Sequence, residues 1–150
     1  MYSPRKIVLA GLLLIVSLVT GCASVPMASM DMDAQAKSFT TPSGKSSIYV
    51  YRNESFGGGI PMTVALDGRV AGSSGPQTYF LFDVPPGPHE VSSIAEDTST
   101  VKLETKPGQA YFIWQEVKMG FWMARSQLHE VDEATGKKGV DECKRAQSNF

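Results

Sequence analysis

The sequence predicts a mainly β protein, a single antiparallel β-sandwich of about seven or eight strands followed by a short helical or irregular C-terminal tail. Three observations support this prediction. The chain has 150 residues, of which 42% are hydrophobic, which suffices for one domain. Short β-branched and aromatic runs recur between turn signals, at spacings of ~8–12 residues. No long segment of helical period interrupts them, so nothing indicates a parallel βαβ sheet.

The composition excludes several classes of protein. The net charge of −1 is too balanced for a nucleic-acid binder, so we expect no nucleic-acid partner. The two cysteines exclude a disulfide scaffold and a cysteine-rich zinc module. No His-x-His or Cys-x-x-Cys pair is present, and we expect no metal and no cofactor.

Residues 1–21 are predicted to be a signal peptide. Arg5 and Lys6 give a positive start, and thirteen uncharged residues follow over 7–19. As a helix, that run spans ~20 Å at ~1.5 Å per residue. The hydrocarbon core of a bilayer is ~30 Å thick. The run is therefore short for a membrane span and typical of a signal peptide.

The end of this segment, Val19-Thr20-Gly21-Cys22, resembles a bacterial lipobox. The resemblance implies that Cys22 carries diacylglycerol and attaches the protein to a membrane. The residue after Cys22 is Ala23 rather than aspartate, which implies sorting to the outer membrane, facing the periplasm. An ordinary signal peptide with a chance cysteine and an uncleaved membrane anchor remain as alternatives.

Residues 22–45 are predicted to be a flexible tether. They are rich in Ala, Ser, Met, Asp and Thr, and no period of 2 or 3.6 holds across them. A loose coil of this length has an r.m.s. reach of ~25 Å.

The sandwich is predicted over residues 46–131. Asp67-Gly68 indicates a type I′ hairpin turn, because both residue types tolerate positive φ. Proline–glycine turns precede two later strands. The predicted strands, in chain order, are 47–52, 60–66, 69–71, 78–84, 89–94, 98–104, 110–118 and 121–131.

The polar tail over 132–150 has weak helical signals. Gly136 and Gly139 each cost ~1 kcal/mol in a helix interior. We therefore expect at most a short helix near residues 140–145, followed by a frayed end.

Aromatic residues crowd three of the predicted strands. The segments 79–82 and 121–123 are apolar on both strand faces. Either these are central strands covered by the tail, or one face is a docking surface. The candidate interaction residues are Tyr79, Trp114, Phe121 and Trp122.

Four motifs together resemble a family of small bacterial lipoproteins that carry a domain of unknown function, similar to PEGA-type and prealbumin-like β-sandwiches. The resemblance implies a fold and a location, and it brings no catalytic residue. The motifs are the strand at 49–52, the hairpin at 64–70, and the two proline–glycine turns with their strands at 84–91 and 106–112.

These observations favour a non-enzymatic envelope lipoprotein that docks a partner protein or an envelope polymer such as peptidoglycan. The alternative is a periplasmic hydrolase or another enzyme with an unrecognised active site. Convergent Asp, His or Ser side chains in one deep cleft would favour the enzyme, and an exposed aromatic surface would favour docking.

Overall fold

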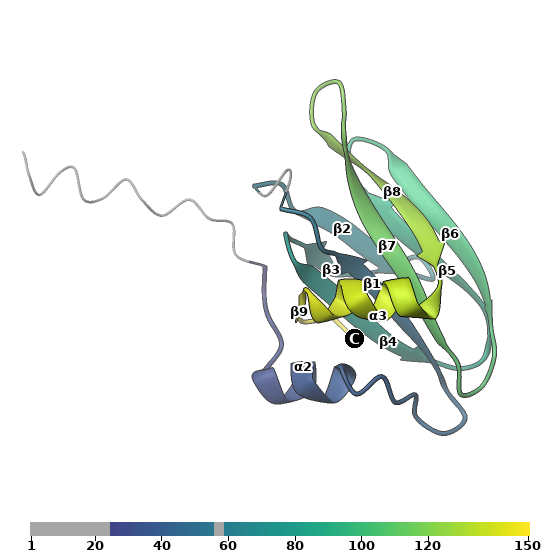
Figure 1. Ribbon diagram of the computed structural model, residues 1–150. Coiled ribbons are helices and arrows are strands. Elements are labelled where there is room, and N and C mark those ends of the chain that lie inside the picture. Colours follow the sequence, from purple (N-terminus) through teal and green to yellow (C-terminus); the bar gives the residue numbers. More distant parts are fainter. Residues whose placement is uncertain (1–24, 56–58) are drawn as a thin grey trace, which may run out of the picture.

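The computed structural model describes residues 25–55 and 59–150. Within them, nine strands form two sheets and two short helices pack on one side (Figure 1). The prediction of a mainly β sandwich is confirmed. The elements are α2 (Met30–Ala36), β1 (Ser46–Arg52), β2 (Met62–Leu66), β3 (Arg69–Ser74), β4 (Thr78–Val84), β5 (Gly87–Ile94), β6 (Thr98–Thr105), β7 (Ala110–Met119), β8 (Ala124–Val131), α3 (Glu133–Asp141) and β9 (Lys144–Arg145).

The two sheets differ in strand direction. One has four antiparallel strands in the order β3-β2-β5-β6. The other has five strands in the order β8-β7-β1-β4-β9, and two of its pairs, β1–β7 and β4–β9, are parallel. The expectation of a purely antiparallel sandwich is therefore wrong for this sheet. Between β1 and β7 the chain forms β2 and β3 of the other sheet, then β4 of this one, then β5 and β6 of the other. These strands, rather than a crossover helix, bring β7 back beside β1 in the same direction.

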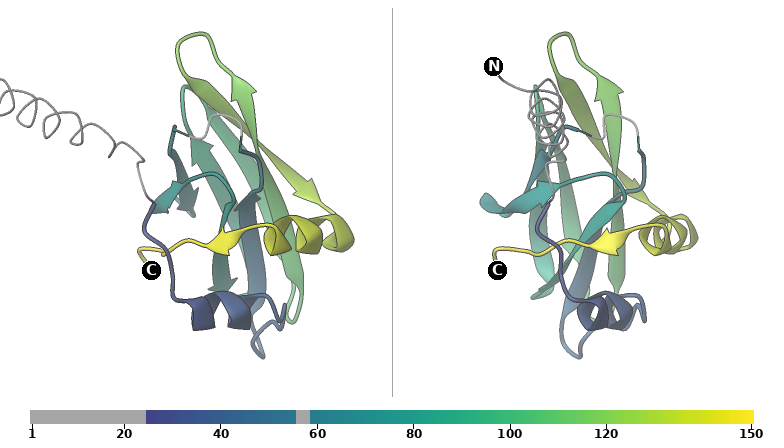
Figure 2. Two further views of the ribbon diagram at one scale, coloured as in Figure 1. Left: turned by 60° about the vertical axis from the view of Figure 1, so that its left-hand side comes forward. Right: turned by 90° about the vertical axis from the view of Figure 1, so that its left-hand side faces the viewer.

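The central strands β1 and β4 of the five-stranded sheet are buried over most of both faces. The inward side chains of this sheet share a core cluster with those of the four-stranded sheet, and its outward ones share a second cluster with residues of α2 and α3. Figures 1 and 2 show the two helices on the outer side of this sheet. Strands buried on both faces lose the alternation of polar and apolar residues. This explains the apolar segment 79–82, which is a central strand. The inward core includes Ile48, Val50, Val64, Phe80, Phe82, Val91 and Ile113, and the outward cluster includes Tyr49, Tyr51, Tyr79, Phe112 and Val140.

The β2–β3 connection is the hairpin that the sequence predicts. Asp67 and Gly68 both have positive φ, at 51° and 76°. Asp67 also binds β5, the neighbouring strand in the sheet, since its Oδ1 accepts a 2.8 Å hydrogen bond from the amide of Glu90.

The tail differs from its prediction, because α3 spans nine residues and includes both glycines. Asp132 caps the helix by accepting a 3.0 Å hydrogen bond from the amide of Thr135. A Cβ on Gly136 would lie 2.2 Å from the side chain of Phe112, and one on Gly139 would lie 2.1 Å from Tyr51. The glycines thus allow the helix to approach the sheet closely, and the packing offsets their low helix propensity.

The segment before the sandwich is also more ordered than predicted. Residues 30–36 form α2, with Ser29 as the N-cap and Ala36 buried. The chain before the helix pairs with the C-terminal tail: Met27 bridges Ala146. The prediction of a flexible tether is thus wrong for residues 25–37. This segment has little periodicity, but contacts with distant parts of the chain keep it ordered.

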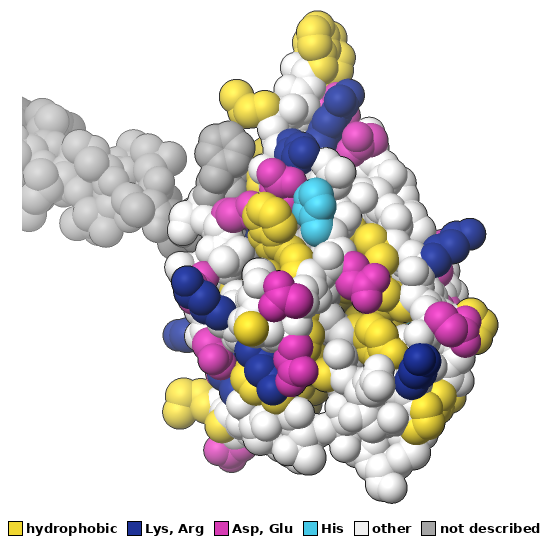
Figure 3. All heavy atoms as spheres, turned by 45° about the vertical axis from the view of Figure 1, so that its right-hand side comes forward, with side chains coloured by type: hydrophobic (Ala, Val, Ile, Leu, Met, Phe, Trp, Pro, Cys, Tyr) yellow, Lys and Arg dark blue, Asp and Glu magenta, His cyan; other side chains and the backbone are white. Residues whose placement is uncertain are grey.

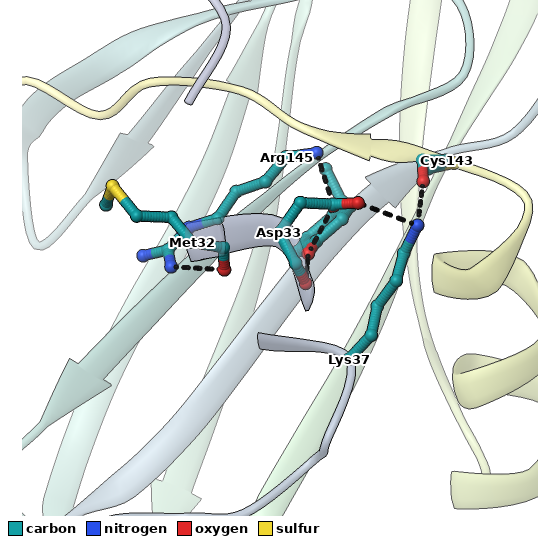
Figure 4. Close-up of polar contacts among 6 residues, drawn as sticks. Met32, Asp33, Lys37, Cys143 and Arg145 are labelled. Carbon is teal, nitrogen blue, oxygen red and sulfur yellow. Dashed lines mark hydrogen bonds and ion pairs between the residues drawn. The ribbon is translucent and has the colours of Figure 1, made fainter. Parts of the chain in front are cut away.

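Asp33 is the centre of this attachment (Figure 4). Its Oδ1 accepts hydrogen bonds from the hydroxyl of Tyr79 at 2.8 Å and from the amide of Arg145 at 2.9 Å. Lys37 lies 3.1 Å from the other carboxylate oxygen and donates to the carbonyl of Cys143 at 2.6 Å. The helix is therefore attached both to the sheet and to the tail.

Candidate functional site

The most exposed group of apolar side chains lies where β7 turns into β8. Met119, Phe121 and Trp122 are 82%, 79% and 84% exposed, and Met123 is 57% exposed. We call residues 119–123 the hairpin tip. In Figure 3 these hydrophobic side chains form the upper end of the molecule, and Figures 1 and 2 show the hairpin extending beyond the neighbouring loops. Clustered apolar exposure of this kind marks an interaction site.

The backbone of the tip is held by one carboxylate from the β5–β6 turn. Glu96 accepts hydrogen bonds from three successive amides, those of Phe121 at 3.2 Å, Trp122 at 3.1 Å and Met123 at 2.8 Å. The amides of Met123 and Trp122 are the main cause that lowers the pKa of Glu96 from 4.5 to about 2. The apolar side chains are therefore displayed from a fixed loop.

Glycine is required at the start of this loop. A Cβ on Gly120 would lie 1.9 Å from the carbonyl oxygen of Met123 and 2.3 Å from the Glu96 carboxylate. The two aromatic rings that follow contact each other edge to face, with centroids 4.8 Å apart. Ile60, from the β1–β2 connection, lines a shallow hollow beside them.

Charged residues surround the base of the tip. Lys118 and Arg125 are register partners on β7 and β8, and each side chain is 46% exposed. The guanidinium Nη2 of Arg125 lies 3.2 Å from Oε1 of Glu96, and Nζ of Lys118 lies 3.5 Å from Oε2 of Glu116. The tip is thus apolar at its end and charged, with both signs present, immediately behind it.

The structure separates the four aromatic residues that the sequence groups together. Tyr79 is fully buried in the outward cluster and does not belong to any surface. Trp114 is half-buried and stacks on His129 at a centroid distance of 5.2 Å. Phe121 and Trp122 lie at the tip.

Sequence reasoning missed Met119, Met123 and Glu96 as parts of the site. Four large apolar side chains around a glycine at a hairpin turn are a usable signal, because turns are ordinarily polar. The role of Glu96 has no local signal, since its partners lie 25–27 residues away.

The two histidines are the natural candidates for a catalytic base. His89 Nδ1 lies 2.7 Å from a carboxylate oxygen of Asp67, and its Nε2 lies 2.7 Å from the carbonyl oxygen of Pro85. Burial lowers the pKa of His89, but these two acceptors outweigh burial and raise that pKa above 6.5. Both ring nitrogens of His89 are engaged by these contacts, so the side chain joins β5 to the hairpin turn. His129 bonds Glu116 at 2.8 Å at the sheet surface.

A buried polar chain crosses the sandwich interior. Ser74 donates to Gln115 at 2.6 Å, Gln115 donates to Ser93 at 2.5 Å, and Ser93 meets Ser126 at 2.5 Å. These side chains satisfy one another between the two sheets, so they serve as structural links.

Several sequence expectations concern residues beyond this site. Cys22 and the predicted signal peptide lie outside the described residues. Cys143 is buried, and burial raises the pKa of its thiol to about 12. In residues 25–55 and 59–150, no cluster of three or more His, Cys, Asp or Glu side chains is arranged to hold a metal ion. The helices of the same residues are too short or too polar to cross a membrane.

The fold and the tip together define a two-sheet β-sandwich with one preformed, exposed apolar hairpin. The chain belongs to the family described as "Protein of unknown function (DUF2846)", whose profile matches residues 42–127. It is also 33% identical over 134 residues to an uncharacterized protein of Haemophilus influenzae, a match covering 88% of this chain and 80% of that protein. No solved structure matches the chain. The expected domain of unknown function is thereby confirmed.

Proposed function

We propose that this protein is a lipid-anchored lipoprotein of the outer membrane, facing the periplasm, with a non-catalytic docking role carried by the hairpin tip. The observation that carries the proposal is the combination of the lipobox at residues 19–22 with an apolar tip held in place by Glu96. An anchored domain with a fixed apolar projection is suited to holding a second component of the envelope. The candidate components are the membrane, another envelope protein and peptidoglycan.

The chemistry of the polar side chains supports a docking role over the alternative hydrolase. Both ring nitrogens of His89 are hydrogen-bonded, to Asp67 and to Pro85, and the buried serines bond to one another and to Gln115. A hydrolase needs a nucleophile beside a free base and an open position for substrate. The pairings of His89 and of the buried serines leave these groups occupied.

We also propose that the sandwich is similar to the PEGA-type and prealbumin-like domains of bacterial surface proteins. The Asp67-Gly68 hairpin and the two proline–glycine turns that lead into β5 and β7 support this proposal.

Replacement of the acylated cysteine tests the anchor. In cells given labelled palmitate, the wild-type protein should take up label and fractionate with the outer membrane, whereas Cys22→Ser should lose both properties. Cys143→Ser is the matched control: it removes the other cysteine, which is buried, and should retain the label. An unlabelled wild-type protein, or a serine variant that still fractionates with the outer membrane, would overturn the assignment.

A further inference from the structure

The described chain begins beside a turn on the half of the sandwich that carries the hairpin tip. Val25, the first described residue, packs against the β3–β4 turn, where a Cβ on Gly75 would lie 2.9 Å from its side chain. That turn, the β5–β6 turn with Glu96, and Ile60 all belong to the end that carries the tip. Figures 1 and 2 show the hairpin extending past the point where the described chain begins.

The link between this end and the membrane is short. Val25 follows Cys22 by only three positions, and three extended residues span at most ~10 Å. The rest of the predicted tether cannot add reach, because Met27, Asp33 and Lys37 hold it against the domain. A lipid on Cys22 therefore keeps this end of the sandwich close to the bilayer surface.

We propose that the hairpin tip inserts into the bilayer to which Cys22 is anchored, as a second, non-covalent membrane contact. This inference rests on the proposed lipid anchor and names the occupant of the same docking surface. Met119, Phe121, Trp122 and Met123 enter the interfacial region of the bilayer.

The shape and chemistry of the tip favour a lipid surface over a protein. Its apolar side chains lie at the end of a narrow, protruding hairpin. A protein partner would need a complementary pocket for such a projection, whereas a fluid bilayer accommodates it without one. Tryptophan is enriched where a membrane meets water. Behind the tip, Lys118 and Arg125 lie at headgroup depth, and nearby acids balance their charge. Insertion should therefore depend on apolar contact, and it should persist at high salt and without anionic lipid.

Tryptophan quenching by brominated acyl chains tests the proposal. The mature protein, purified from membranes and shown by mass spectrometry to be acylated at Cys22, is reconstituted in phosphatidylethanolamine vesicles with and without brominated lipid. We expect a blue-shifted emission that loses most of its intensity with bromine. Trp122→Phe should abolish the quenched component and leave the emission of Trp114, the other tryptophan.

A relocated tryptophan is the matched control. Met30 is 86% exposed on α2, which lies at the end opposite the tip (Figure 1). In the double variant Met30→Trp/Trp122→Phe, the relocated indole should have the emission of a water-exposed tryptophan and resist quenching. Equal quenching of the relocated indole and of Trp122 in the wild-type protein would overturn the proposal, because it would show that the domain has no fixed orientation on the membrane.

Two outcomes distinguish the failure of this inference from that of the proposed function. Acylated protein whose Trp122 is not quenched would leave the anchor in place and overturn tip insertion. Protein without acyl chains at Cys22 would overturn both. A photo-crosslinking amino acid at position 122 provides the second readout in cells. Adducts to lipid alone support insertion, and a discrete adduct to a protein or to peptidoglycan overturns it.

Discussion

The hydroxyl of Tyr79 donates a 2.8 Å hydrogen bond to the carboxylate of Asp33, and this contact joins the N-terminal segment to the centre of the sandwich. Tyr79 is fully buried. Burial is the main cause that raises its pKa, and the bond to Asp33 adds to that effect. Tyr79, which the sequence suggests as an interaction residue, is therefore a core residue that holds α2 in place.

Removing the hydroxyl should loosen that helix. Tyr79→Phe keeps the ring and deprives Asp33 of one partner, and a hydrogen bond to a charged group contributes ~1.5–3 kcal/mol. We expect a loss of this size in chemical denaturation and faster tryptic cleavage after Lys37. Tyr111→Phe removes a more exposed hydroxyl and is the control, with little change in either measurement. Unchanged cleavage in Tyr79→Phe would show that this hydrogen bond does not hold the helix.

Gly139→Ala should destabilise the domain, although alanine is the better helix former. At a solvent-exposed position inside a helix, Gly→Ala stabilises the folded state by ~1 kcal/mol. Here the added Cβ would lie 2.1 Å from the ring of Tyr51, and overpacking costs ~1–3 kcal/mol. The sign of the change in unfolding free energy is the measurement. Lys138→Ala, on the exposed side of α3, should be nearly neutral, and a stabilised Gly139→Ala would contradict the close packing.

Gly68→Val tests the β2–β3 turn. Gly68 has φ of 76°, and a β-branched residue in such a conformation costs ~1–3 kcal/mol. The melting temperature should fall accordingly. Lys102→Val places valine at an exposed position of β6, where surface changes stay within ~0.5 kcal/mol. Equal effects of the two substitutions would mean that the turn does not constrain φ.

The order of the hairpin tip should depend on pH through Glu96. Its pKa falls from 4.5 to about 2 on folding, so the ionised carboxylate stabilises the loop above pH 4.5 and this contribution is lost as pH falls toward 2. Fluorescence anisotropy of Trp122, taken as the difference from Trp122→Phe, should decrease over that range. Glu96→Gln should lower the anisotropy already at neutral pH. Asp97→Asn, which alters only a 3.7 Å contact with Arg125, should not.

The strands and their turns could be predicted because their signals are local. Asp67-Gly68, the proline–glycine pairs and the β-branched runs act within a few residues. The two helices could not be predicted, because their stability comes from partners far along the chain. Asp33 binds Arg145 across 112 positions, and Gly136 and Gly139 are favourable only against Phe112 and Tyr51.

The same distinction applies to the site. The aromatic residues at 121 and 122 were visible in the sequence, but Tyr79 and Trp114 have the same character and lie in different places. Alternation along a strand separates two faces, and it does not show which face a helix will cover. The packing of α2 makes Tyr79 part of the core, whereas Trp122 is exposed because it lies in the turn between β7 and β8.

The pairing of Met27 with Ala146 and of Asp33 with Arg145 joins the first and last parts of the described chain. During synthesis, the partners of the N-terminal segment are therefore made last. Residues 27–37 have nothing to dock on until Arg145 and Ala146 have been added, and α2 can take its place only then. The earliest described part of the chain is thus among the last to reach its final position.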